Sequence, residues 1–208
     1  MDYLTLAIAT GRTSKKAMEL LEESGVSFPD YHKKTRKLVI YDETKTVKLI
    51  FVKTADLTTY VEKGAADIGI VGKDTIMEEQ TDVYELLDLN LGKCQLAVAG
   101  FPKQRMQSEA PLIVATKYPL ITKSFFDEKG IRIETIKLNG SIELAPLIGL
   151  SDVIVDIVET GKTLNENGLV LLDKVIDISA RLIVNEASFA TKMEQIGKFI
   201  TNLKAELE

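Results

Sequence analysis

Short apolar runs rich in valine and isoleucine recur along the chain and are separated by segments with helical patterns. Uninterrupted runs of this length are typical of strands buried on both faces of a sheet. Because the runs alternate with helical segments, the pattern predicts an α/β protein with a mostly parallel sheet. The expected strands are residues 4–9, 38–41, 47–52, 68–71, 96–99, 112–115, 131–136 and 153–158.

Capping signals and apolar spacing predict two of the helices. Asp56 is a candidate N-cap for a helix over 57–63, and Gly64 follows where a left-handed residue closes a helix. A last helix from about residue 186 has an apolar stripe at three- to four-residue spacing. The segment 37–53 instead predicts a hairpin around a polar turn, so the sheet is expected to be mixed. The stripe consists of Phe189, Met193, Ile196, Phe199, Ile200, Leu203 and Leu207.

No flexible linker divides the chain, so any division into domains must be made by strands that cross between them. Two segments fit such crossings, residues 86–100 and 182–185. We therefore expect a first α/β domain over residues 1–90, completed by the C-terminal helix over 183–208, and a second over 91–182. Ligands in such layouts bind at the carboxyl ends of strands, here in a cleft between the domains.

The charge balance and the counts of cysteine and histidine limit the kinds of partner and site that the chain can have. The 208 residues carry 26 Lys and Arg against 31 Asp and Glu, a net charge of −5, so neither nucleic acid nor a membrane surface is expected as a partner. One cysteine, Cys94, and one histidine, His32, exclude a disulfide framework and a Cys/His zinc site. We interpret Cys94 as a core residue and His32 as a loop residue. The apolar stretch after Asp2 is too short for a signal peptide, which favours a cytoplasmic protein.

The segment 153–164 carries the most informative chemistry. An apolar strand ends in Asp156 and Glu159, and a small hydroxyl-rich turn then begins a helix. A nucleotide P-loop is excluded, because its pattern requires glycine five residues before Gly161 and this position is occupied by Asp156. Backbone N–H groups at a helix N-terminus can still bind one phosphate. The turn that would do so is Thr160, Gly161, Lys162 and Thr163.

Two carboxylates before a phosphate-binding turn suit a ribose, whose hydroxyl groups need acceptors beside the 5'-phosphate. The pattern therefore favours a phosphoribosyl site. The alternative, in which Asp156 and Glu159 are solvent-facing acids and the turn is an ordinary one, stays open at this point.

Further motifs extend this picture over nearly the whole chain. The stretch 138–152, with Glu143-Leu-Ala-Pro146, leads directly into the strand at 153, and other motifs lie at Gly11-Arg12 and at residues 55–62, 64–74 and 115–119. On these motifs the chain resembles the ATP phosphoribosyltransferase family of histidine biosynthesis, in its short form. The resemblance implies transfer of the 5-phosphoribosyl group of 5-phosphoribosyl 1-diphosphate to N1 of ATP, with release of diphosphate and with magnesium (Mg2+) on the phosphates.

The resemblance also implies a partner and a set of site residues. The partner is a regulatory subunit that resembles histidyl-tRNA synthetase, in a hetero-octamer. Catalytic roles fall on Arg12, Arg36 and Lys53, and donor binding on Asp156, Glu159, Thr160, Gly161, Lys162 and Thr163. ATP binding falls on Gly11, Asp56, Gly72, Lys73, Asp74 and Glu143, while protein ligands of the metal stay unassigned.

Ordinary structural roles remain open for several of these residues. Arg12 and Arg36 can be surface cations, and Asp56 an N-cap. Lys73, Asp74 and Glu143 can be residues of helix starts. The first turn also departs from the family, because Thr10 stands where the family usually has lysine.

Two other functions fit part of the pattern. Two α/β domains crossed by two strands form the type II periplasmic-binding-protein-like layout, so a cytosolic solute-binding or sensor module is the main non-enzyme alternative. A phosphoribosyltransferase with a free nucleobase as acceptor is the second, because the donor turn does not select the acceptor. A binding module would bind one ligand tightly without turnover of 5-phosphoribosyl 1-diphosphate. Identification of the product formed with ATP or with adenine distinguishes the two enzymes.

Overall fold

The computed structural model describes residues 3–32, 36–104, 106 and 109–207, apart from the Arg12 side chain. Asp2 and the Lys33-Lys34 pair lie outside this description. The chain divides into two compact units, one formed by Met1–Gly92 with Ser179–Glu208 and the other by Lys93–Ile178. The chain thus leaves the first unit after Gly92 and re-enters it at Ser179, whereas the sequence placed these divisions near residues 90 and 182.

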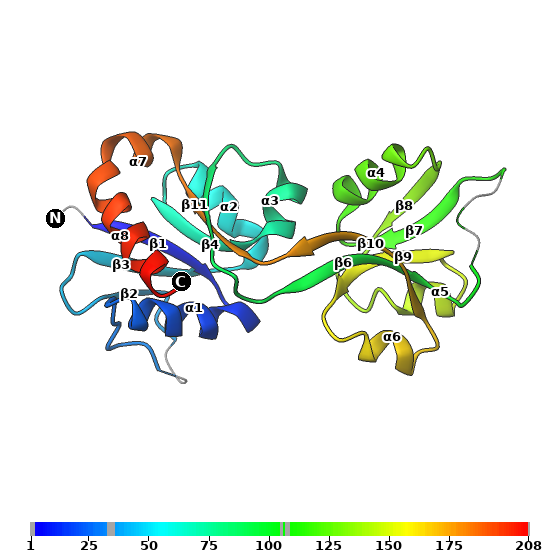
Figure 1. The fold of residues 1–208 in the computed structure, drawn as a ribbon, viewed down its shortest axis with the longest axis horizontal. Helices are drawn as coiled ribbons and strands as arrows, with labels where there is room; N and C mark the ends of the chain where they lie inside the picture. The colour runs from blue at the N-terminus through cyan, green and yellow to red at the C-terminus, as the bar shows by residue number, and fades with distance from the viewer. Residues whose placement is uncertain (1–2, 33–35, 105, 107–108, 208) are drawn as a thin grey trace. The chain divides into compact units, whose positions relative to one another are not determined.

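The first unit, unit 1, is built on a six-stranded mixed sheet (Figure 1). Its strand order is β2-β3-β1-β4-β11-β5. Strand β1 pairs in parallel with β3 and β4, while β2–β3, β4–β11 and β11–β5 are antiparallel pairs. The predicted hairpin is confirmed by β2 and β3. The strands are β1 (Leu4–Ala9), β2 (Val39–Tyr41), β3 (Val47–Val52), β4 (Ile68–Gly72), β5 (Tyr84–Asp88) and β11 (Ala180–Val184).

Helices cover the sheet of unit 1 on both faces. One face packs on α1 and α8 through a core cluster that includes Leu6, Leu21 and Phe199. The other face packs on α2 through Leu57 and Val61. The carboxyl ends of β1, β3 and β4 each lead into a helix, so these helix starts meet at one edge of the sheet. The helices are α1 (Arg12–Glu23), α2 (Thr54–Glu62), α3 (Lys73–Glu79), α7 (Glu186–Thr191) and α8 (Met193–Ala205).

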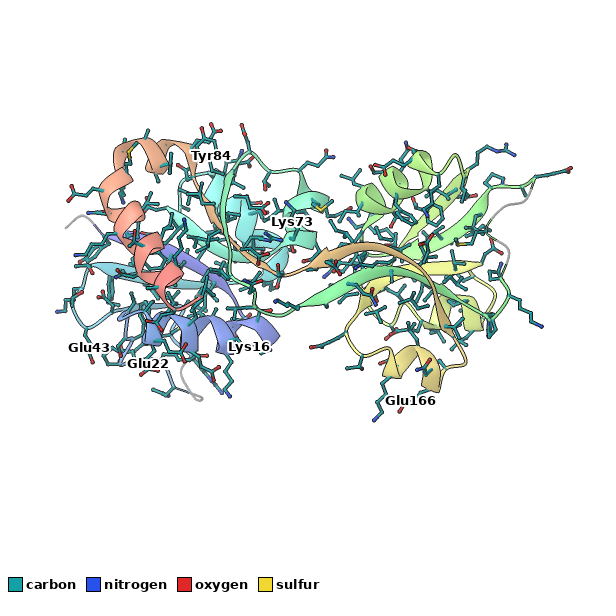
Figure 2. All side chains as sticks on the ribbon, in the orientation of Figure 1. Lys16, Glu22, Glu43, Lys73, Tyr84 and Glu166 are labelled. Atoms are coloured by element: carbon teal, nitrogen blue, oxygen red, sulfur yellow. The ribbon has the colours of Figure 1, made fainter. Side chains whose placement is uncertain are left out.

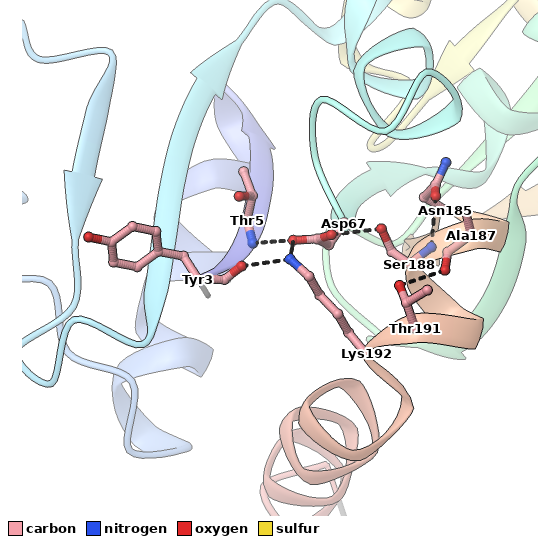
Figure 3. A network of polar contacts seen from close by, with 8 residues as sticks. All are labelled: Tyr3, Thr5, Asp67, Asn185, Ala187, Ser188, Thr191 and Lys192. Atoms are coloured by element: carbon pink, nitrogen blue, oxygen red, sulfur yellow. Dashed lines mark hydrogen bonds and ion pairs between the residues drawn. The ribbon is translucent and has the colours of Figure 1, made fainter. Parts of the chain in front are cut away.

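The C-terminal segment forms two helices, so the expectation of one continuous helix is wrong. Helix α7 ends and α8 begins at Lys192, whose backbone is not helical (φ −120°, ψ 28°). The Lys192 ammonium donates to the carboxylate of Asp67 at 2.9 Å and to the carbonyl of Tyr3 at 2.8 Å (Figure 3). No glycine or proline marks this position in the sequence, so local sequence signals did not predict the division into two helices.

Asp67 links this C-terminal segment to the sheet. Its carboxylate accepts hydrogen bonds from the Thr5 N–H at 2.7 Å and from the Ser188 hydroxyl at 2.6 Å (Figure 3). Asn185 caps α7 by accepting from the Ser188 N–H at 2.9 Å. Because Asp67 is buried, these donors compensate for the loss of its hydration.

The second unit, unit 2, has a five-stranded mixed sheet in the order β10-β6-β9-β7-β8 (Figure 1). Strand β9 pairs in parallel with β7 and antiparallel with β6. The strands are β6 (Cys94–Gly100), β7 (Leu112–Thr116), β8 (Ile133–Lys137), β9 (Val153–Val158) and β10 (Val170–Ile178). The helices are α4 (Pro119–Glu128), α5 (Leu144–Leu147) and α6 (Lys162–Glu166).

Some local expectations are corrected. Lys53, not Asp56, occupies the N-cap position of α2, and Asp56 lies in the first turn of that helix. Cys94 is partly exposed at the start of β6 rather than a core residue. His32 lies in a loop and is exposed, as predicted. Across the residues that the structure describes, no helix has both the length and the apolar character needed to cross a bilayer.

Candidate active site

Among the residues that the structure describes in unit 2, Asp156 is the one whose pKa departs most from its ordinary value. It lies near the carboxyl end of β9 and is half-buried. Burial is the largest cause that raises the pKa of Asp156, to about 6, and the negative charge of Glu143 raises this pKa further. A hydrogen bond from the Ile157 N–H at 2.8 Å and the positive charge of Lys117 act in the opposite direction. The fold therefore brings Asp156 and Glu143 into one electrostatic environment, although the sequence assigned them to different substrates.

Lys117 was not among the predicted site residues, although its motif was recognised. It directly follows β7, the parallel neighbour of β9. Thr116 fixes the chain at this point, since its hydroxyl donates to the Val155 carbonyl at 2.8 Å and accepts from the Tyr118 N–H at 2.9 Å. A cation placed directly after an expected parallel strand was the signal that could have identified Lys117.

The turn after β9 has the local geometry that the sequence predicted. Gly161 occupies the N-cap position of α6 in the left-handed region (φ 71°), where a residue with a side chain is strained. Glu159, Thr160, Lys162 and Thr163 are exposed on this turn, and Leu164 anchors it in the core. Within the turn the Lys162 N–H donates to the Thr160 hydroxyl at 3.4 Å. The exposed Thr160 and Thr163 offer hydroxyl groups to an anion a few residues after Asp156.

A small hollow of about 70 Å³ marks the edge of the unit 1 sheet where β1, β3 and β4 end. Gly11 and Gly72, both predicted ATP-binding residues, line it together with Thr10 and Thr54. A hollow of this size has room for a small chemical group. It adjoins the start of α1.

The glycines of the 69–72 segment have different roles. The sequence suggested that they allow close approach of a ligand, but the position of a Gly69 side chain is occupied by Leu57 and Val61 of α2, each 2.8 Å from the place of its Cβ. Gly72 leaves room for the carboxylate of the buried Asp74. Gly69 is therefore a packing residue of the core.

The remaining predicted cations of unit 1 lie near strand ends. Lys73 is the first residue of α3, and its ammonium pairs with Glu85 at 2.5 Å (Figure 2 labels Lys73). Lys53 and Asp56 are both exposed, and the Asp56 N–H donates to the Lys53 carbonyl at 3.0 Å. Arg36 is exposed ahead of β2, while Arg12 begins α1 with its side chain outside the described structure.

The geometry defines a class of protein first. Two mixed-sheet α/β units, with a half-buried Asp156 followed by an exposed turn in unit 2, fit the class of α/β proteins that act on a phosphorylated ribose. The sequence profile of the ATP phosphoribosyltransferase family matches residues 53–205. The chain belongs to this family.

Individual relatives agree with this assignment. The ATP phosphoribosyltransferase of Oceanobacillus iheyensis is 50% identical over 203 residues, and the match covers 98% of each chain. That of Clostridioides difficile is 53% identical over 201 residues, or 96% of each chain. A chain of the solved ATP phosphoribosyl transferase (HisG:HisZ) complex from Thermotoga maritima is 36% identical, with a TM-score of 0.84 over 98% of both chains.

These comparisons confirm three predictions. The fold class is that of two mixed-sheet α/β units of the type II periplasmic-binding-protein-like kind. The chain is a pentosyltransferase, and the activity of its family is the first step of histidine biosynthesis. Neither the solute-binding module nor the enzyme with a free nucleobase acceptor is favoured.

Proposed function

We propose that this chain transfers the 5-phosphoribosyl group of 5-phosphoribosyl 1-diphosphate to N1 of ATP and releases diphosphate, and that unit 2 binds the donor. The observation that carries the proposal is the half-buried Asp156 directly ahead of the exposed turn at residues 159–163. Carboxylates accept hydrogen bonds from ribose hydroxyls, and the N–H groups of the turn donate to a phosphate.

In this proposal the donor is held at two points. Asp156, in its ionised form, and Glu159 accept hydrogen bonds from the ribose hydroxyls. The backbone of Gly161 and Lys162 and the hydroxyls of Thr160 and Thr163 surround the 5'-phosphate. Because Gly161 is left-handed, the turn presents its N–H groups without a Cβ on the ligand side.

The acceptor needs alignment more than activation. N1 of adenine is a neutral nucleophile, so no strong general base is required, and catalysis rests on orientation and on stabilisation of the leaving diphosphate. Arg12, Arg36 and Lys53 are the proposed cations for that charge. Gly11, Asp56, Gly72, Lys73, Asp74 and Glu143 are the proposed ATP-binding residues, and Thr10 supplies no cation where the family usually has one.

Magnesium fits the proposed donor site. Mg2+ is usually bound by substrate phosphates with one or two carboxylates, and Glu143 lies close enough to Asp156 for its charge to raise the pKa of Asp156. Bound with the substrates, the ion would neutralise phosphate charge and orient the diphosphate. The phosphates of the substrates are the ligands proposed to hold it.

A regulatory partner is part of the proposal. The structural neighbour from Thermotoga maritima was solved as a HisG:HisZ complex, and the sequence resemblance implies a subunit similar to histidyl-tRNA synthetase. We propose that this chain is the catalytic subunit of such a hetero-octamer.

The test is turnover of the purified chain with ATP, 5-phosphoribosyl 1-diphosphate and Mg2+, with and without the synthetase-like subunit. Diphosphate release together with the ultraviolet signal of N1-ribosylated ATP is expected, and replacement of ATP by adenine should abolish both. Donor binding without turnover in either mixture would contradict the proposal.

A further inference from the structure

Four charged residues and a serine form a connected network in unit 1, which we name the Glu85 network. The Glu85 carboxylate pairs with Lys73 at 2.5 Å and with Arg181 at 3.5 Å. Arg181 also pairs with Asp88 at 3.0 Å, and Asp88 accepts from the Ser179 hydroxyl at 2.8 Å. The network therefore joins the start of α3 to strands β5 and β11.

A β-bulge places Glu85 in this network. Leu182 pairs with Leu87, but the next residue, Ile183, pairs with Glu85, so Leu86 is the extra residue of β5. With regular pairing Glu85 would lie on the opposite face of the sheet, since side chains alternate along a strand. Leu86 and Leu87 both pack on the core that includes α8, which leaves Glu85 on the face of Arg181. Bulges commonly re-aim a side chain in this way.

Arg181 is an unusual residue for its position. It lies in β11, between β4 and β5, and its side chain is 22% exposed. Among the described atoms, its Nε is buried without a hydrogen-bond partner. An apolar residue there would avoid this cost. The guanidinium instead contacts Asp88 and Oε1 of Glu85, while Lys73 contacts Oε2 of the same Glu85 carboxylate.

The contact with Glu85 restricts the Lys73 side chain to fewer rotamers. A lysine ammonium on four methylenes loses rotamer entropy when a ligand fixes it, and a preformed bond reduces that loss. The ammonium has three donors, so a bond to Glu85 leaves capacity for a phosphate oxygen. The Lys73 and Glu85 side chains are 28% and 26% exposed, so the pair is shielded and remains accessible to a ligand.

We infer that Glu85, held by Arg181, is the positioning residue that orients Lys73 toward the phosphates of ATP. The inference rests on the proposed ATP-binding role of Lys73 and goes beyond it, because neither Glu85 nor Arg181 belongs to the predicted site. Glu85 acts through Lys73 and does not touch the substrate.

The test is a double-mutant cycle on the complete chain, with steady-state kinetics for ATP. Glu85→Gln keeps the shape and removes the charge, and it should raise the KM for ATP about fivefold to twentyfold, with a much smaller change in kcat. In the Lys73→Ala background the same change should have no further effect. Glu85→Asp keeps the charge but is one methylene shorter, so an intermediate rise is expected.

The controls separate the inference from the function on which it rests. Glu79→Gln makes the same chemical change on the exposed surface of α3 and should leave the KM unchanged. If Lys73→Ala leaves the KM for ATP unchanged, the proposed role of Lys73 fails. If Lys73→Ala raises it but Glu85→Gln leaves it unchanged or lowers it, or if the two changes add, the positioning role of Glu85 is overturned.

Discussion

At the scale of single residues, Asp156 combines a structural cost with its proposed role. Its pKa of about 6 lies above the ordinary value of 3.8, so the folded state disfavours the ionised form. The stability that this carboxyl contributes is present below pH 4 and is lost as the pH rises through 6. Above pH 6 the enzyme therefore keeps a destabilising charge where a ribose needs an acceptor, a combination that is common at functional sites.

Replacement of Asp156 by Asn should separate these effects. Asp156→Asn is expected to stabilise the free chain at pH 8 by about 1 to 2 kcal/mol, measured by thermal or urea unfolding, because the disfavoured charge is gone. The same variant should weaken donor binding. In the unchanged enzyme kcat/KM for the donor is expected to rise with pH near 6 as Asp156 ionises, and this rise should be smaller in the variant. The 5'-phosphate of the donor titrates near this pH as well, so only the difference between the two profiles belongs to Asp156.

Glu159→Gln is the matched control, because Glu159 is an exposed acid three residues further along. It should weaken donor binding without the gain in stability. Unchanged donor affinity of the Asp156→Asn variant would contradict the ribose assignment. A loss of stability of the same variant at pH 8 would contradict the electrostatic argument.

Gly161 allows a second residue-scale prediction. Valine at this left-handed position costs about 1 to 2 kcal/mol and places a branched side chain on the proposed phosphate turn. Gly161→Val should therefore raise the KM for the donor at least about tenfold. Gly168→Val is the control, because Gly168 has nearly the same φ of 72° with open space around it, beyond the end of α6. Equal kinetics for the two variants would show that the turn does not bind the phosphate.

The proposed donor residues could be named from the sequence because they lie close together in the chain. One strand end and one turn contain all of them, and local chemistry identifies such a segment. The roles of Glu85 and Arg181 became visible only in the structure, because strand pairing brings these distant residues together. Lys117 carried a sequence signal, but its proximity to Asp156 depends on the pairing of β7 with β9. A lysine in a sequence does not reveal which carboxylate orients it.

At the scale of elements, mostly apolar strands inside a sheet were predicted well and polar edge strands were not. The bounds expected for β1, β3 and β9 agree with the structure, since each lies between two neighbouring strands and contains at most one charged residue. Strand β10, with Asp173, Lys174 and Asp177, was not predicted, because it is an edge strand whose polar residues hide the pattern. Strand β5 is also an edge strand, and β11 was expected only as a short crossing segment.

Close packing of α2 on β4 gives the prediction at this scale. A methyl group at Gly69 would lie within 2.8 Å of both Leu57 and Val61, so Gly69→Ala should destabilise the chain by about 1 to 3 kcal/mol. Gly197→Ala is the opposite case, because Gly197 lies within α8 with open space around its Cβ position. That change should stabilise the chain by about 0.5 to 1 kcal/mol. Urea unfolding measures both, and a neutral Gly69→Ala would show that α2 can move away freely.

At the scale of the whole molecule, the two units differ in how the chain builds them. Unit 2 is one continuous segment, Lys93–Ile178, with its own buried core. Unit 1 is assembled from two segments, and β11 from the second lies between β4 and β5 of the first. Without the returning segment, β5 loses the strand with which it pairs, and β4 keeps β1 but loses β11. Asp67 also loses Ser188 and Lys192.

Folding should therefore be possible for one fragment and not for the other. A fragment of residues 93–178 is expected to unfold cooperatively in a thermal melt followed by circular dichroism. A fragment of residues 1–92 should show no cooperative transition, because β4 would be an exposed apolar edge strand. Fusion of residues 1–92 to 179–208 through a short flexible linker restores β11 and should recover the transition. Cooperative unfolding of 1–92 alone would mean that α1, α2 and the parallel strands form a sufficient core, and that the returning segment adds stability without being required for the fold.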